Sequence, residues 1–400
     1  MTPRRVARIA AVVLLTAVAL VGGVPTAAAS APAWSGLDSR AYDGPTPPPG
    51  QLLDAVALDP ALSVSGAGAA YRTLYSTRDQ HGRPAVSTAV VFTPKTPAPQ
   101  GGWPVVAWAH GTVGLGDDCT PSALTRSERD DEYLSHWLDQ GYVVVGSDYA
   151  GLGTPGLMSY LNSVTTARGV VDSVLAAHQM DLRLSPKWAV VGQSQGGAAA
   201  VATARWASEF SAESDAGAEL DYRGVVATGT PAQVETIVKQ AGPAMPVPPE
   251  LGPMASAYTA YIVAALRDAR PDLDLNRVLT DAGRAAADEA EIRCAADLAG
   301  TLAGMSVPSF FSAPVTSIPG AAAAIDDFMG IPSSGYDRPL FLGVGLQDRD
   351  VPADLTLRFA EKLRSNDQDV TLKVYPDSDH SGTVLTSIPD STAFLAGIFS

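Results

Sequence analysis

A serine stands between glycines where a strand-like run gives way to small helix formers, in residues 188–200, WAVVGQSQGGAAA. The stretch opens with apolar residues suited to a short buried strand and closes with alanines that favour a helix. Glycine costs backbone entropy in both kinds of element, so three glycines around one hydroxyl need a structural reason. The pattern predicts a sharp strand-to-helix turn at Ser194.

Short apolar runs alternate with helical stretches on both sides of this turn. Strands are predicted over residues 103–110, 142–148, 188–192 and 222–230, and helices over 131–140, 163–180 and 195–210. This alternation is typical of a parallel sheet with helices on both faces. Ahead of it, residues 71–79 and 84–94 predict an antiparallel hairpin that turns near Gly82. A proline- and glycine-rich lead-in at residues 31–53 is expected to be irregular.

The alternation stops over residues 231–335 and then resumes. A strand is predicted at 339–348, a helix at 353–365, a strand at 370–377 and a last helix from Thr392. The intervening segment contains helical stretches at 258–269 and 279–300. We therefore expect a core made of residues 30–230 and 336–400, interrupted by a helical insertion at 231–335. The insertion is either a lid over a site or a second structural domain with no gating role.

The first 29 residues have the order of a secretory signal peptide. Three arginines precede an apolar run at residues 9–21, and small residues follow it. We predict cleavage after Ala29, with an uncleaved anchor as the alternative. Export would place the two cysteines, Cys119 and Cys294, in an oxidising compartment, which favours a disulfide between them. Two buried free thiols are the alternative.

Charge and motif content exclude several classes of protein. The net charge is −15, and no basic run occurs outside the N-terminus, so a nucleic-acid partner is not expected. A stable membrane anchor is not expected either. The histidines are scattered, and there is no H-E-x-x-H or paired C-x-x-C, so we predict no metal. Glycines at 151, 153 and 156 imitate a dinucleotide-binding motif, but Pro155 interrupts it and no helix follows at once. We therefore predict no cofactor.

The serine turn matches the G-x-S-x-G pattern of a nucleophile elbow, Gly192-Gln193-Ser194-Gln195-Gly196. A nucleophilic serine needs a histidine base that a carboxylate orients, and in elbow enzymes the chain order is Ser, Asp or Glu, then His. His380 is the one histidine after Ser194. Asp348 ends the strand predicted at 339–348, and Asp350 follows it two residues later. We prefer Asp348, because it ends the apolar run, and keep Asp350 as the alternative.

A second group of residues is expected to stabilise an oxyanion. The backbone N–H of Gln195 follows the serine at the start of a helix, where the helix dipole also favours negative charge. The turn after the strand at 103–110 contains His110 and Gly111, and we expect the N–H of the next residue, Thr112, to face Ser194.

With these residues placed, the chain resembles the secretory lipase family of fungi and actinobacteria, within the α/β-hydrolase fold. The motifs that carry the resemblance are WAHGTVG, DDCTPS, GYVVVGSDYAGLG, GQSQGG, GLQDRDVP and DSDHSG. The resemblance implies a triad of Ser194, Asp348 and His380, with Thr112 and Gln195 as oxyanion donors. It further implies export, a disulfide, and hydrolysis of acylglycerols and simpler carboxylic esters beneath a helical lid.

The predicted function is therefore that of a secreted serine lipase or carboxylesterase acting on an ester or lipid, including one at a lipid–water interface. Within residues 231–335, Met254, Tyr258 and Tyr261 offer apolar surface, and Phe310 and Phe311 are the candidate acyl-binding residues. A secreted serine peptidase or amidase of the same fold is one alternative, and a non-catalytic binding protein is another. The sequence leaves the acyl chain length and the oligomeric state open.

Overall fold

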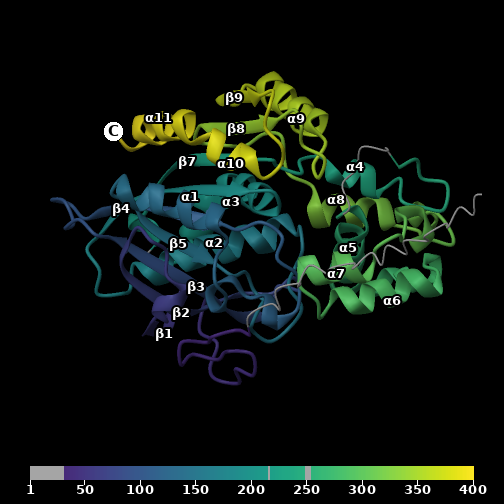
Figure 1. Ribbon diagram of the computed structural model, residues 1–400, viewed down its shortest axis with the longest axis horizontal. Helices are drawn as coiled ribbons and strands as arrows, with labels where there is room; N and C mark the ends of the chain where they lie inside the picture. Colours follow the sequence, from purple (N-terminus) through teal and green to yellow (C-terminus); the bar gives the residue numbers. More distant parts are fainter. Residues whose placement is uncertain (1–30, 215–216, 248–253) are drawn as a thin grey trace, which may run out of the picture. The chain divides into compact units, whose positions relative to one another are not determined.

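The computed structural model describes residues 31–214, 217–247 and 254–400 (Figure 1). Residues 31–400 cluster as one compact unit. The predicted signal peptide, residues 1–29, lies outside the described residues. None of the helices described combines the length and the apolar character needed to cross a membrane.

A single nine-stranded sheet forms the core of the described chain. Its spatial order is β1-β2-β3-β5-β4-β6-β7-β8-β9. The first three strands and β5 pair antiparallel, and from β5 through β4 to β9 every pairing is parallel. This confirms the expected mostly parallel sheet with an antiparallel hairpin at its start. The strands are β1 (Leu52–Ala57), β2 (Ala67–Arg78), β3 (Pro84–Pro94), β4 (Trp103–Ala109), β5 (Val143–Ser147), β6 (Leu184–Gln193), β7 (Asp221–Thr228), β8 (Leu340–Gly345) and β9 (Val370–Tyr375).

Helices cover both faces of the sheet, because neighbouring residues of a buried strand point to opposite sides. In β4, Ala107 packs into the same cluster as α2 (Ser163–Ala177), α3 (Gln195–Ser211) and α9 (Ala353–Ser365). The next residue, Trp108, packs instead with α1 (Glu128–Asp139), α10 (Gly382–Thr386) and α11 (Ile388–Phe399). The predicted three-layer arrangement is confirmed.

Two expectations about local structure were wrong. The lead-in is irregular through Gln51, as expected, but its last two residues, Leu52 and Leu53, begin β1. This strand pairs antiparallel with β2 and is largely exposed, so its residues show no alternation that would have revealed an edge strand. The last helix begins at Ile388 rather than Thr392, because Pro389 is accommodated in its first turn.

Residues 231–335, which we call the cap segment, contain helices and no named strand among their described residues. Figure 1 shows these helices, in green, grouped beside the strands. The helical stretch expected at 279–300 is interrupted at Cys294, which is extended and forms an antiparallel bridge with Gly114. The helices are α4 (Val234–Val238), α5 (Ala255–Ala269), α6 (Asp281–Ala290), α7 (Ala295–Thr301) and α8 (Ala321–Met329).

The predicted disulfide is confirmed: Cys119 and Cys294 are joined, with their Cα atoms 5.3 Å apart. It connects the loop after β4 to the start of α7 in the cap segment. Beside it, the N–H of Ala295 donates to the carbonyl oxygen of Val113 at 2.8 Å. The loop that carries Thr112 is therefore fastened to the cap segment at two points.

Candidate active site

Ser194 occupies a strained backbone position between β6 and α3. Its φ is 59° and its ψ is −127°, in the region that residues with a side chain rarely adopt, and its N–H donates to the carbonyl of Thr228 at 3.0 Å. A Cβ added at Gly196 would lie 1.9 Å from the carbonyl oxygen of Ala109, and one at Gly192 would lie 2.1 Å from that of Gly196. The glycines are therefore required for close packing, and the predicted sharp turn is confirmed.

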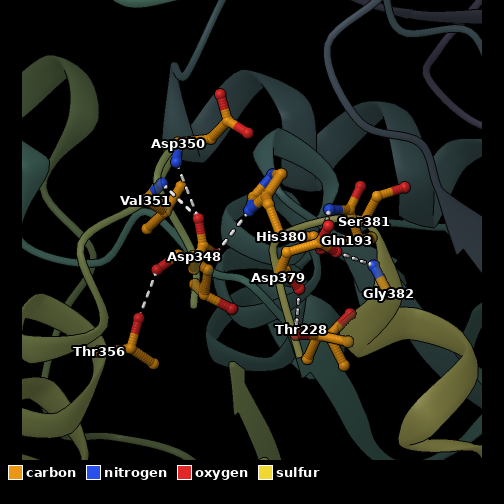
Figure 2. A network of polar contacts seen from close by, with 12 residues as sticks. Gln193, Thr228, Asp348, Asp350, Val351, Thr356, Asp379, His380, Ser381 and Gly382 are labelled. Carbon is orange, nitrogen blue, oxygen red and sulfur yellow. Dashed lines mark hydrogen bonds and ion pairs between the residues drawn. The ribbon is translucent and has the colours of Figure 1, made fainter. Parts of the chain in front are cut away.

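The histidine and the aspartate come from the ends of neighbouring strands. Asp348 follows β8 and His380 follows β9, and Nδ1 of the imidazole lies 2.6 Å from Oδ2 of the carboxylate (Figure 2). The other carboxylate oxygen, Oδ1, accepts the N–H groups of Asp350 and Val351 at 2.9 and 2.8 Å. The Asp348 side chain is only 2% exposed. Of the two candidate carboxylates, Asp348 is thus the one bound to His380.

Two further residues hold the imidazole in place, and the sequence did not reveal either. The side-chain amide of Gln193 donates to the carbonyl oxygen of His380 at 3.3 Å. Gly229, just after β7, has a φ of +54°, and a Cβ there would lie 3.0 Å from the ring atoms Cε1 and Nδ1 of His380. A glycine directly after a strand of a parallel sheet was the available signal, but only the fold brings it against the histidine.

Ser194, His380 and Thr112 line one cavity of about 390 Å³. Nε2 of His380 is buried and has no hydrogen-bond partner among the described residues. Ser194 and Nε2 of His380 therefore make no direct hydrogen bond to each other, although both residues line the same cavity. The arrangement leaves Nε2 available to take a proton from a group in this cavity.

The predicted oxyanion donors, Thr112 and Gln195, belong to two segments next to Ser194. A Cβ added at Gly111 would lie 3.5 Å from the Cβ of Ser194, and the following residue, Thr112, lines the cavity. The Thr112 hydroxyl pairs with the Tyr160 hydroxyl at 2.8 Å, which fixes its rotamer. Gln195 is the first residue of α3, and its side chain is buried near the sulfur of Met158. Any role of Thr112 and Gln195 therefore rests on their backbone N–H groups.

The second histidine of the cavity, His110, is packed in the protein interior. Burial lowers the pKa of His110, so the neutral ring is favoured. Its Nδ1 lies 2.7 Å from the carbonyl oxygen of Gly111, and its ring packs against that of Tyr149 with the centroids 4.5 Å apart and the planes tilted by 37°. These contacts indicate that His110 stabilises the turn after β4.

One group of side chains has the composition of a metal site. Possible ligand atoms of Asp348, Asp350 and His380 lie within 4.8 Å of one another, and the described residues contain no second such cluster. Nδ1 of His380 and Oδ2 of Asp348 are, however, already engaged with each other at 2.6 Å. The geometry therefore favours a hydrogen-bonded pair over a metal centre.

A second, smaller cavity of about 110 Å³ lies within the cap segment, and its lining is almost entirely apolar. Phe311 lines it, whereas Phe310 lines neither this cavity nor the one at Ser194 and is buried against Gly283. The structure thus separates the two phenylalanines that the sequence analysis grouped. The lining residues are Val234, Ile237, Val238, Ala241, Met245, Tyr258, Thr259, Ile262, Val263, Leu266, Leu275, Val278, Leu279, Val307, Phe311 and Val315.

Comparisons with known proteins agree with this geometry. Residues 122–314 match the family model described as Secretory lipase, and residues 327–397 match that of the Prolyl oligopeptidase family. A search of curated proteins gives no significant match. Lipase A of Candida antarctica in its closed state aligns with a TM-score of 0.71 and 19% identity, over 90% of this chain and 86% of that chain. A ligand-bound rice cell wall degrading esterase, LipA of Xanthomonas oryzae, aligns with a TM-score of 0.66 and 21% identity, over 86% and 95%.

At these identities the solved structures establish a shared fold. Together with the sheet order and the serine turn, they define the chain as an α/β hydrolase. Within that class the chain matches the secretory lipase family model over residues 122–314, which include the serine turn and much of the cap segment. It is accordingly a serine ester hydrolase of the lipase and esterase type.

Proposed function

We propose that the protein hydrolyses acylglycerols and simple carboxylic esters through an acyl-enzyme on Ser194. The observation that carries the proposal is the shared cavity, which both the strained Ser194 and His380 line. Nε2 of His380 has no hydrogen-bond partner in the described part of the chain, while Nδ1 is bound to Asp348. A serine becomes nucleophilic only when a base removes its proton, and the base works only in the correct tautomer.

The proposed reaction has two steps, acylation of Ser194 and its deacylation by water, and the same groups act in both. His380 Nε2 accepts the Ser194 proton as the hydroxyl oxygen attacks the ester carbonyl carbon. The N–H groups of Thr112 and Gln195 stabilise the oxyanion, and Asp348 stabilises the imidazolium. His380 then gives its proton to the departing alcohol, and a water molecule, activated in the same way, releases the acid from Ser194.

The cap segment, residues 231–335, is proposed to act as a lid that supplies the acyl site. Its cavity is lined by apolar side chains, which suits a fatty acyl chain. The cavity at Ser194 has polar residues instead on the side of Ser127, Arg129 and Ser381, which suits the alcohol part of the ester. The alternative that these cap residues only pack the cap segment predicts equal effects on all esters.

A panel of p-nitrophenyl esters from acetate to palmitate, assayed beside an emulsified triglyceride, tests the substrate class. Phe311→Ala should impair long-chain esters more than acetate, because Phe311 lines the apolar cavity. Phe310→Ala is the matched control, since Phe310 is equally buried outside the cavity and should affect all esters alike. Equal losses in the two variants across the panel would leave the cavity without a role in acyl binding.

A peptidase or amidase activity is the second candidate, favoured by the match of residues 327–397 to the Prolyl oligopeptidase family. That segment carries Asp348 and His380, which both reaction types would use. Peptide p-nitroanilides in the same assay separate the two: turnover above that of esters would favour the peptidase. A non-catalytic binding protein would need none of the three residues at the cavity.

We also propose that the protein is secreted, with residues 1–29 removed as a signal peptide. The family and the disulfide between Cys119 and Cys294 support an oxidising compartment. N-terminal sequencing of protein recovered from culture medium should give Ser30 as the first residue. Recovery only with cells, or a retained Met1, would contradict the proposal.

A further inference from the structure

The cavity at Ser194 is built almost wholly by the core, and among its described lining residues one comes from the cap segment. That residue is Tyr258, on the first full turn of α5. The apolar cavity shows the opposite composition, because all of its lining residues belong to the cap segment, and Tyr258 is again among them. Of the residues that the structure describes, Tyr258 is the one that the two lining sets share.

A hydrogen bond holds the Tyr258 side chain toward the core. Its hydroxyl donates to Oδ1 of Asp350 at 3.3 Å. Asp350 in turn donates its backbone N–H to Asp348, the carboxylate bound to His380. The phenol is thus fastened to the loop that positions the imidazole. A partly exposed side chain with one long hydrogen bond can be displaced more cheaply than a packed core residue.

We propose that Tyr258 is the partition between the two cavities and thereby determines which acyl chains the enzyme accepts. This inference rests on the proposed function. With the ring in its present place, a short acyl group fits beside Ser194 without entering the cap segment. A longer acyl chain reaches the apolar cavity only when the ring turns away from Asp350. Tyr258 is therefore a specificity-determining residue, and its hydroxyl and its ring make separable contributions.

The test is the ratio of kcat/KM for p-nitrophenyl decanoate to that for p-nitrophenyl acetate. Tyr258→Ala removes the partition and should raise the ratio by about tenfold or more, the scale on which apolar pockets discriminate chain length. Tyr258→Phe keeps the ring but loses the bond to Asp350, so it should raise the ratio by less. Tyr258→Leu serves the same purpose as the alanine variant if that variant does not fold.

Two further variants separate this role from simple packing. Tyr261→Phe is the matched control, because Tyr261 lies on the same helix, donates to the carbonyl of Arg293 and lines neither cavity. It should leave the ratio unchanged. Ile262→Trp fills the apolar cavity and should cancel the gain when combined with Tyr258→Ala.

The outcomes are distinguishable from a failure of the proposed function. If the unaltered enzyme hydrolyses no ester, the proposed function fails. If it hydrolyses esters but Tyr258→Ala and Tyr258→Leu leave the ratio unchanged or lower it, the partition is refuted. The partition is also refuted if Tyr258→Ala raises the ratio and the combination with Ile262→Trp leaves it equally high, because the long acyl chain would then lie outside the apolar cavity.

Discussion

Replacing Asp348 with asparagine should remove nearly all activity by inverting the tautomer of His380. Oδ1 of Asp348 accepts two backbone N–H groups, at 2.9 and 2.8 Å, so an asparagine would keep its carbonyl oxygen at that position. The amide NH₂ would then face Nδ1 of His380, which is now 2.6 Å from Oδ2, and Nδ1 would have to accept. The imidazole proton would move to Nε2, which could no longer accept the proton of Ser194.

The expected loss in kcat is about 10⁴-fold, or about 5.5 kcal/mol of transition-state stabilisation, by analogy with other serine triads. Asp350→Asn is the control: the Asp350 carboxylate accepts from Tyr258, and an asparagine keeps an acceptor for that hydroxyl. The loss in kcat for Asp350→Asn should stay below about tenfold. The assay is kcat and KM with p-nitrophenyl acetate, with melting curves to show that both variants fold. A larger loss for Asp350→Asn would refute the tautomer argument.

Three other perturbations follow from named contacts. Gly229→Ala should lower kcat/KM by about tenfold or more, because a Cβ there would displace His380, while Gly300→Ala, with open space around it, should not. Replacing both Cys119 and Cys294 with serine should lower the free energy of unfolding by about 5 kcal/mol in the chain-entropy model, given a sequence separation of 175; a loss below about 1 kcal/mol in denaturant titration would contradict this. Burial raises the pKa of Asp172 from 3.8 to about 7, so stability should fall as the pH rises from about 4 to 7, by up to about 4 kcal/mol. Asp172→Asn should remove this pH dependence. If the difference in free energy of unfolding between Asp172→Asn and the unaltered protein stays constant from about pH 4 to 7, the raised pKa of Asp172 is refuted.

Much of the core could be predicted because its signals are local. The helix expected at residues 353–365 has those bounds in the structure, and the glycines around Ser194 alone predicted the turn there. Chain order alone led to His380, and the end of an apolar run led to Asp348. In these places the sequence pattern and the fold depend on the same few neighbouring residues.

The parts that escaped prediction depend on residues distant in the chain. β1 forms because it pairs with the free edge of β2. The helix breaks before α7 because Cys294 forms a β-bridge with Gly114 and a disulfide with Cys119. Gly229 reads as an ordinary turn glycine until His380 is placed 3.0 Å from its missing Cβ. Tyr258 and Tyr261 look alike in sequence, and only their different positions on α5 place one of them at both cavities.

The most direct test of the central claim is covalent labelling with a fluorophosphonate, followed by peptide mapping. We predict one label per chain, on Ser194, with loss of ester hydrolysis in proportion to labelling. Ser194→Ala should fold with an unchanged melting curve, take up no label and hydrolyse no ester above background. A label on another residue, or turnover that persists in Ser194→Ala, would contradict the account.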